Sequence, residues 1–354
     1  MNVLGLFAGI GTFELGLRNK GFNVTALCEI EEHCNKVLTK NFPEATMYGD
    51  VKTLPTLGNI DVICGGFPCT DISIAGKGEG GIHGEKSGLW KEFKRVINNE
   101  RPKYAIIENV FAILGRGLEV VLQDLAEIGY DATYTMLDSQ YCGVPQRRRR
   151  VYILAVRDGI SEGSDPFQFE ERSTTKCRTS MESVKASFEW DFKQECEGSE
   201  AFTYLTRQRS DLFAECGVSS TLMKRDYKDF TDLIVSDKRV RKVTPKERLL
   251  LQGIPSDWWD GCGLTNTQKF TCNGMSLPAV EWIAERLLEF DMEVGTGGNV
   301  DADFYSDGYY RVLDASERGS SMVVNGEYFP SVFSLEVLKR RVDYINLKEN
   351  TNET

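Results

Sequence analysis

The stretch "LGLFAGIGTFELG", residues 4–16, joins a short apolar run to two closely spaced glycines and the start of an amphipathic helix. Glycines between a strand and a helix let the backbone approach a ligand, and the helix N-terminus favours negatively charged groups. A tight turn that serves strand–helix packing alone explains Gly9 and Gly11 equally well. The stretch therefore predicts a strand that leads directly into a helix, and it leaves a ligand at the junction open.

Glu14 stands where a dinucleotide-binding fingerprint has its third glycine. A carboxylate beside a pyrophosphate is unfavourable, so the sequence favours a cofactor without phosphates over NAD. Glu29 at the end of the second predicted strand can accept hydrogen bonds from a ribose, and Asp50 after the third can read an adenine amino group. Three ligand-facing positions on successive strand ends suit an adenosyl compound such as S-adenosylmethionine.

Outward from this stretch, short apolar runs alternate with helical patterns through residue 157. Strands are predicted at residues 2–7, 23–28, 45–49, 60–65, 104–109, 132–137 and 150–156, and helices at 12–20, 31–42, 89–99 and 118–129. This alternation predicts an α/β fold with a doubly wound, mostly parallel sheet that binds ligands at the carboxyl ends of its strands.

The rest of the chain suggests three further regions. Residues 158–237 are polar and irregular, and they carry 17 acids and 10 bases. Helical patterns resume at 244–252 and 277–290, so residues 238–290 are expected to return to the first domain. Residues 291–354 carry 12 acids and 6 bases, with turn signals at "SDG" and "NGE" and a helix from about residue 334. We expect this tail to form a small α+β appendage that neither reads nucleic acid nor takes part in catalysis.

Composition limits the class of protein. The 354 residues are 41% hydrophobic and 27% charged, and we expect no membrane span and no signal peptide. Ten cysteines without a C-x-x-C pair, and only two histidines, indicate free thiols in a reducing cytoplasm and no bound metal.

The net charge is −11, yet residues 139–157 hold five arginines and no acid, and residues 238–248 hold six bases. Such local stripes favour phosphate binding, although arginine runs are often simply solvated.

Chemistry-bearing residues follow the fourth, fifth and last strands of the predicted sheet. Cys69 in "GGFPC" lies in a glycine-flanked turn and is either a nucleophile or a small buried apolar residue. Glu108 in "IIENV" is either a proton donor with a raised pKa or a salt-bridged structural acid. In "PQRRRR", alternate residues of an extended segment share a face, so Arg148 and Arg150 are expected to point together, away from Arg147 and Arg149.

Together these residues carry a resemblance to the DNA (cytosine-5)-methyltransferases. It rests on "LFAGIG", "GGFPC", "ENV", "QRRRR", "RKVTPKERLLLQGIP" and "NGMSLPAVEWIAERL", and it covers residues 3–157 and 238–290. The resemblance implies an S-adenosylmethionine-dependent fold, a target-recognition region at residues 158–237 and a flipped-out cytosine in double-stranded DNA. It also implies a monomer acting in the cytoplasm of a bacterium or encoded by its phage.

The resemblance also implies roles for individual residues. Cys69 attacks C6 of cytosine, Glu108 engages N3 and the amino group, and Arg150, supported by Arg148, holds the base. The implied cofactor residues are Phe7, Gly9, Ile10, Gly11, Glu29, Ile30, Asp50, Val51, Pro68, Leu89 and Ser276. The glycine-rich segment 75–88 suits a loop that closes over the base, or a plain linker.

The chain departs from the family pattern at two positions. Met275 stands where asparagine is usual beside the cofactor, and Thr70 stands where glutamine is common. Two other functions remain open, a tRNA cytosine-5 methyltransferase and a catalytically inactive DNA-binding regulator. The 80 residues between the arginine motif and "RKVTPKE" favour a DNA-reading region over the first, and the joint presence of Cys69, Glu108 and Arg150 argues against the second.

Overall fold

The computed structural model describes residues 1–68, 89–160, 202–206, 213–216, 219–228, 232–236, 239–272, 274–295, 322–324 and 327–329. It divides into two compact units, Met1–Val300 and Asp301–Thr354. Cys69, Thr70 and the glycine-rich segment 75–88 lie outside the described residues.

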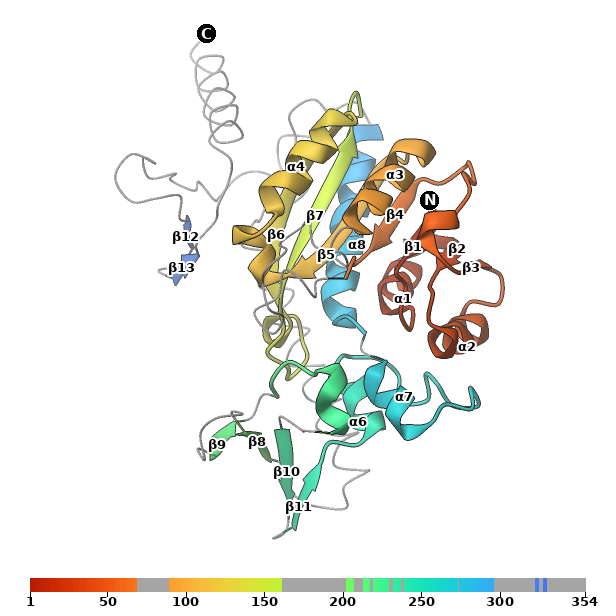
Figure 1. Cartoon of the computed structure of the whole chain (residues 1–354). Coiled ribbons are helices and arrows are strands. Elements are labelled where there is room, and N and C mark those ends of the chain that lie inside the picture. Colours follow the sequence, from red (N-terminus) through yellow and green to blue (C-terminus); the bar gives the residue numbers. More distant parts are fainter. Residues whose placement is uncertain are drawn as a thin grey trace. The chain divides into compact units, whose positions relative to one another are not determined.

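The larger unit is built on a seven-stranded sheet (Figure 1). Its strands are β1 (Asn2–Leu6), β2 (Asn23–Cys28), β3 (Thr46–Tyr48), β4 (Val62–Gly65), β5 (Tyr104–Val110), β6 (Tyr130–Asp138) and β7 (Arg149–Arg157), in the order β3-β2-β1-β4-β5-β7-β6. The strands pair in parallel except where β7 inserts antiparallel between β5 and β6. The α/β fold with a doubly wound, mostly parallel sheet is therefore confirmed, and the chain reverses its winding between β1 and β4, where ligands bind in such sheets.

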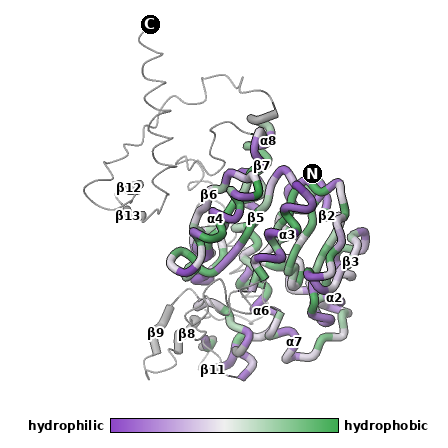
Figure 2. The backbone as a smooth tube through the Cα atoms, turned by 45° about the horizontal axis from the view of Figure 1, so that its top comes forward, coloured by the Kyte–Doolittle hydropathy of each residue, from purple (hydrophilic) through white to green (hydrophobic). Residues whose placement is uncertain are grey.

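Helices cover both faces of this sheet. One apolar cluster joins the sheet to α1 (Thr12–Asn19), α2 (Glu32–Asn41) and α8 (Leu277–Gly295), and a second joins it to α3 (Trp90–Glu100) and α4 (Leu118–Glu127). Successive strand residues alternate between the clusters, with Val3 in the first and Leu4 in the second. Figure 2 shows the apolar segments gathered along the central strands. The alternation explains why these strands read as continuous apolar runs in the sequence.

Helix α8 lies against α1 although more than 250 residues separate them in the chain. A Cβ on Gly16 would stand 2.6 Å from Cγ1 of Val280, so only glycine permits this approach of the two helices. Lys20 Nζ also lies 2.6 Å from Glu285 Oε1 at the edge of the contact. Helices α8 and α1 therefore belong to the same helical layer on one face of the sheet.

Residues 202–242 contribute a second, smaller sheet for which the sequence analysis assigned no strands. It contains β8 (Phe202–Thr206), β9 (Phe213–Cys216), β10 (Asp232–Ser236) and β11 (Arg239–Lys242), antiparallel in the order β11-β10-β8-β9. Two capped helices follow, α6 (Pro245–Leu250) and α7 (Asn266–Thr271), and each begins at a threonine in a capping box. The larger unit, Met1–Val300, also contains four short 3-10 helices: η1 (Val51–Thr53), η4 (Phe111–Gly115), η5 (Ser139–Tyr141) and η6 (Lys224–Tyr227).

In the second unit the structure describes one hairpin, β12 (Met322–Val324) and β13 (Glu327–Phe329). Val324 pairs with Glu327, which agrees with the turn signal at "NGE". The "SDG" signal and the predicted terminal helix lie outside the described residues. In the described part of the chain, no helix is both long and apolar enough to cross a bilayer.

Candidate active site

The turn after β1 leads directly into α1, as the sequence predicted, and its backbone is partly left-handed. Phe7, Gly9 and Gly11 have φ values of 54°, 57° and 79°, in the left-handed region that glycine adopts at little cost. The N–H of Gly9 donates to Oε2 of Glu29 at 2.7 Å. The first turn and the end of β2 are therefore joined at the carboxyl edge of the sheet.

Glu29 is fixed by two backbone donors. It is 8% exposed, and its Oε1 accepts from the N–H of Glu31 at 2.8 Å while Oε2 accepts from Gly9. A carboxylate offers about four acceptor positions, so this side chain retains capacity for hydroxyl donors. Ile30 beside it is 69% exposed, which leaves a bare apolar surface next to the carboxylate. An acid beside an open apolar side chain suits a sugar attached to a flat ring.

The other predicted cofactor residues differ in accessibility. Asp50 is half-buried and accepts from the N–H of Lys52 at 3.0 Å, while Phe7, Pro68 and Leu89 are also half-buried. Ile10 and Val51 are 1% and 5% exposed, so their side chains belong to the core and offer a ligand only backbone atoms. The hydroxyl of Ser276 is buried and has no hydrogen-bond partner among the described residues, and the same is true of Thr12. Both hydroxyls can still take up a donor or acceptor from a ligand.

Glu108 and Arg150 meet at the ends of β5 and β7. Arg150 Nε lies 2.9 Å from Glu108 Oε1, as an ion pair that lacks the alignment of a hydrogen bond. Along the arginine run, Arg148 and Arg150 are half-buried whereas Arg147 and Arg149 are exposed, so the predicted alternation is confirmed. Arg149 instead lies over the ring of Phe111, at 5.3 Å from its centroid.

Glu108 and Met275 both pack closely around Gly66. A Cβ on Gly66 would stand 2.6 Å from Oε2 of Glu108 and 3.2 Å from Cε of Met275. The departure from the family pattern at Met275 therefore puts a methyl group beside the turn that leads to Cys69. Burial and the charge of Glu108 raise the pKa of neighbouring Tyr152 far above its ordinary value.

Asn109 is a site residue to which the sequence analysis gave no role. It is 1% exposed, and its Nδ2 donates to the carbonyl of Phe67 at 3.3 Å, two residues before Cys69. Gln146 is fully buried, and neither atom of its side-chain amide has a partner among the described residues. An amide close behind the apolar run "YAII" is the signal that could have identified Asn109 in the sequence.

The arginine motif is also bonded to the smaller sheet's region. The N–H of Arg147 donates to Ser219 O at 2.8 Å, the N–H of Ser219 donates to Pro145 O at 2.8 Å, and Thr221 Oγ1 donates to Arg147 O at 2.6 Å. Residues 219–221 are thus hydrogen-bonded to the backbone of residues 145–147.

The strand order and the ligand-facing strand ends define a fold of the S-adenosylmethionine-dependent methyltransferase type. Solved structures agree. The Dnmt2 methyltransferase of S. pombe matches with a TM-score of 0.61 at 18% identity, over 82% of this chain and 99% of that one. The methyltransferase EhMeth of Entamoeba histolytica matches with a TM-score of 0.57 at 18% identity, over 82% and 98%.

Sequence comparison gives the family. The family model for C-5 cytosine-specific DNA methylase matches residues 1–289. The type II methyltransferase M1.ScrFI of Lactococcus lactis is 30% identical over 81% of this chain and 78% of its own length. M2.BsuMI of Bacillus subtilis is 39% identical over 44% of this chain, and that alignment spans 42% of M2.BsuMI. The chain belongs to the C-5 cytosine-specific DNA methylase family.

Proposed function

We propose that the protein transfers a methyl group from S-adenosylmethionine to C5 of a flipped-out cytosine in a specific sequence of double-stranded DNA. The Glu108–Arg150 ion pair carries this proposal, because it sets an acid and a guanidinium beside the turn that leads to Cys69. Supporting it are the family match over residues 1–289 and the type II methyltransferases among the relatives.

The residues at the β1–β3 edge fit the cofactor. Glu29 has acceptor capacity for ribose hydroxyls, Ile30 offers an open apolar face for adenine, and Asp50 offers a carboxylate for its amino group. The orphan hydroxyls of Thr12 and Ser276 provide further polar contacts. When bound, S-adenosylmethionine supplies an electrophilic methyl group on a sulfonium.

The protein's own groups then activate the base. The Cys69 thiolate adds to C6 of cytosine, and the electron pair moves toward C5, which becomes nucleophilic enough to accept the methyl group. Glu108 engages N3 and the exocyclic amino group and stabilises the charge that develops there, while Arg150 holds Glu108 and the base. Loss of the C5 proton to a base then returns the electron pair and expels Cys69. Stacking in the duplex covers both faces of the cytosine ring, from which the thiolate and the methyl donor must approach, so the cytosine must leave the stack.

We further propose that residues 158–237 read the DNA sequence and that the protein acts as a monomer in the cytoplasm of a bacterium. The hydrogen bonds between Ser219 and the arginine motif support the first part, since they join that region to cations suited to phosphates. The relatives come from bacteria and a bacteriophage, which supports the second.

Covalent trapping tests the mechanism. A duplex with 5-fluorocytosine at the target should trap wild-type protein, because fluorine at C5 blocks the elimination that releases Cys69. Cys69→Ser should neither trap nor methylate while keeping its affinity for S-adenosylmethionine, and Cys262→Ser should behave as wild type.

Bisulfite sequencing of plasmid from expressing cells identifies the DNA sequence that the protein methylates. Methylation without trapping would refute the covalent mechanism, and tritium transfer to tRNA but not to duplex DNA would refute the substrate.

A further inference from the structure

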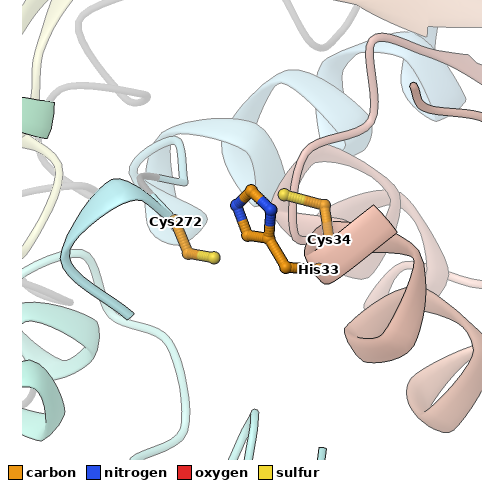
Figure 3. A group of neighbouring side chains, drawn as sticks. All are labelled: His33, Cys34 and Cys272. Atoms are coloured by element: carbon orange, nitrogen blue, oxygen red, sulfur yellow. The ribbon is translucent and has the colours of Figure 1, made fainter. Parts of the chain in front are cut away.

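His33, Cys34 and Cys272 come together at the junction of two segments that lie far apart in the sequence. His33 and Cys34 belong to the first turn of α2, and Cys272 directly follows α7. One potential ligand atom from each residue lies within 4.8 Å of the other two. Figure 3 shows the imidazole and the two thiols turned toward one another. The sequence analysis expected no metal because the chain has no C-x-x-C pair and only two histidines.

We propose that His33, Cys34 and Cys272 bind a zinc ion, with water as the fourth ligand. Two thiolates and one imidazole are a donor set that zinc prefers over Mg²⁺ and Ca²⁺, which take oxygen ligands. In a tetrahedral zinc site neighbouring ligand atoms are about 3.3–3.8 Å apart. The present separations therefore need movements on the order of 1 Å, which side-chain rotation supplies.

One ring nitrogen of His33 lies near a hydroxyl and the other near a carboxylate. Its Nε2 lies 3.5 Å from Oγ1 of Thr271, the residue before Cys272. Its Nδ1 lies 3.7 Å from Oε2 of Glu31. Histidines that bind metal usually direct the second ring nitrogen to a carboxylate or carbonyl, which orients the ring. Glu31 is placed to do this for His33.

Access and charge also suit a cation. Cys34 and Cys272 are 6% and 3% exposed, whereas the side chain of His33 is 18% exposed and leaves a path from solvent. Two carboxylates, Glu29 and Glu31, and one ammonium group, Lys224, act on Cys272 through space. Of these three groups, the two carboxylates favour a cation beside Cys272, and Lys224 opposes it.

A disulfide between Cys34 and Cys272 is the competing use of these thiols. A disulfide would use only the two thiols. It would not explain why His33 lies beside them with Glu31 near its Nδ1. Zinc uses all three side chains together with the carboxylate behind them. The metal therefore accounts for more of the observed geometry.

The proposed ion would clamp two segments that border the candidate cofactor site. On one side, Asn35 in the same turn of α2 donates to the carbonyl of Glu29 at 3.0 Å. On the other, Gly274, two residues after Cys272, packs against Thr12. A Cβ on Gly274 would stand 2.2 Å from Oγ1 of Thr12. This link between the two segments is independent of the proposed methyl transfer.

Metal binding by the full-length chain tests the proposal. Purified protein, stripped with chelator under reducing conditions, is titrated with Zn²⁺ against a chromophoric competitor and separately with Co²⁺. We expect one equivalent bound, with the sulfur-to-metal charge-transfer absorption that thiolates give with Co²⁺. His33→Gln, Cys34→Ser and Cys272→Ser should each weaken binding at least roughly a hundredfold, and Glu31→Gln roughly ten- to a hundredfold.

Controls separate this site from other thiols and from misfolding. Cys262→Ser, at a half-exposed thiol outside the cluster, should bind Zn²⁺ as wild type does, and a Cys69→Ser background removes the thiol assigned to chemistry. Zinc should raise the midpoint of thermal unfolding of wild type and Cys262→Ser but not of His33→Gln, whose site is open enough to fold without metal. Less than one equivalent bound by wild type, equal binding by His33→Gln, or a Cys34–Cys272 disulfide in its place would overturn the proposal.

Discussion

Arg150 Nε lies 2.9 Å from Oε1 of Glu108 because β7 runs antiparallel to β5 and pairs Arg150 with Val110. The two side chains are only 14% and 11% exposed, so neither charge is well solvated by itself. A parallel strand at this place would carry its first residues to the opposite edge of the sheet. The reversed direction of β7 is therefore what delivers an arginine to the acid.

Replacing Arg150 by Met should slow methyl transfer by roughly a hundred- to a thousandfold, the usual cost of removing a group that stabilises developing charge. It should also lower the free energy of unfolding by about 1–3 kcal/mol, because Glu108 loses its partner. Single-turnover transfer of tritiated methyl groups at saturating DNA measures the first effect, and urea unfolding measures the second.

Arg149→Met is the matched control, since Arg149 is adjacent in sequence but exposed over Phe111. It should weaken DNA binding and reduce its salt dependence while leaving the single-turnover rate at saturating DNA unchanged. Equal rates for Arg150→Met and wild type would remove Arg150 from the candidate site.

Asn109→Ala should loosen the turn that leads to Cys69, because Nδ2 of Asn109 holds the carbonyl of Phe67. The lost hydrogen bond is worth about 1 kcal/mol, so covalent trapping by a 5-fluorocytosine duplex should slow roughly fivefold. Affinity for S-adenosylmethionine should not change. Asn98→Ala, at an exposed position on α3, serves as control, and a cofactor defect in Asn109→Ala would contradict a positioning role.

The sequence predicted the sheet well because every central strand is buried on both faces and so appears as an apolar run. It assigned no strands to the smaller sheet, whose members have four or five residues. One of them, β11 with the sequence "RVRK", was interpreted only as a basic stripe. Short strands with charged side chains give a weak alternation signal, and only pairing with β10 identifies them.

The sequence identifies candidate site residues where they lie at the end of a strand. It does not identify those that tertiary packing brings together from distant segments. Glu29 and Glu108 follow apolar runs, which marks them in the sequence. Cys272 lies 238 residues beyond Cys34, so no spacing rule connects them. Glu14 was interpreted as an obstacle to phosphates, but the structure buries it completely against Gly5, behind the turn rather than in it.

Glu29→Gln should weaken binding of S-adenosylmethionine roughly ten- to a hundredfold, which corresponds to about 1.5–3 kcal/mol for a charge-assisted hydrogen bond. Part of the loss has a local cause. The N–H groups of Gly9 and Glu31 donate to different oxygens of Glu29, and in glutamine an NH2 group, which cannot accept, replaces one of them. Titration calorimetry measures the affinity. Glu32→Gln, whose side chain is 87% exposed, should bind the cofactor normally, and unchanged affinity in Glu29→Gln would exclude Glu29 from the cofactor site.

Glu14 should make the stability of the protein depend on pH. Burial, with the nearby charge of Glu29 adding to it, raises the pKa of Glu14 from 4.5 to about 8. Oε2 of Glu14 has no hydrogen-bond partner among the described residues, and Oε1 lies 3.9 Å from the weak donor Cys64 Sγ. A hydrogen bond from the backbone N–H of Glu14 itself offsets only part of the effect of burial. The folded protein therefore holds this proton at neutral pH, whereas the unfolded chain releases it.

The sign follows from proton linkage. Between the unfolded pKa of 4.5 and the folded value of about 8, the folded state binds one more proton than the unfolded state. The free energy of unfolding should therefore fall by about 1.4 kcal/mol per pH unit as pH rises through this window, and the contribution of Glu14 should be flat below and above it. Glu14→Gln is neutral in both states, so urea unfolding at about pH 5.5 and about pH 7.5 should show a decline smaller than that of wild type by about 2–3 kcal/mol. Glu119→Gln, at an exposed position in the first turn of α4, should retain the wild-type decline. If the free energy of unfolding of wild type and of Glu14→Gln declines equally between these pH values, then Glu14 is ionised in the folded protein. In that case a partner must neutralise the charge of its carboxylate.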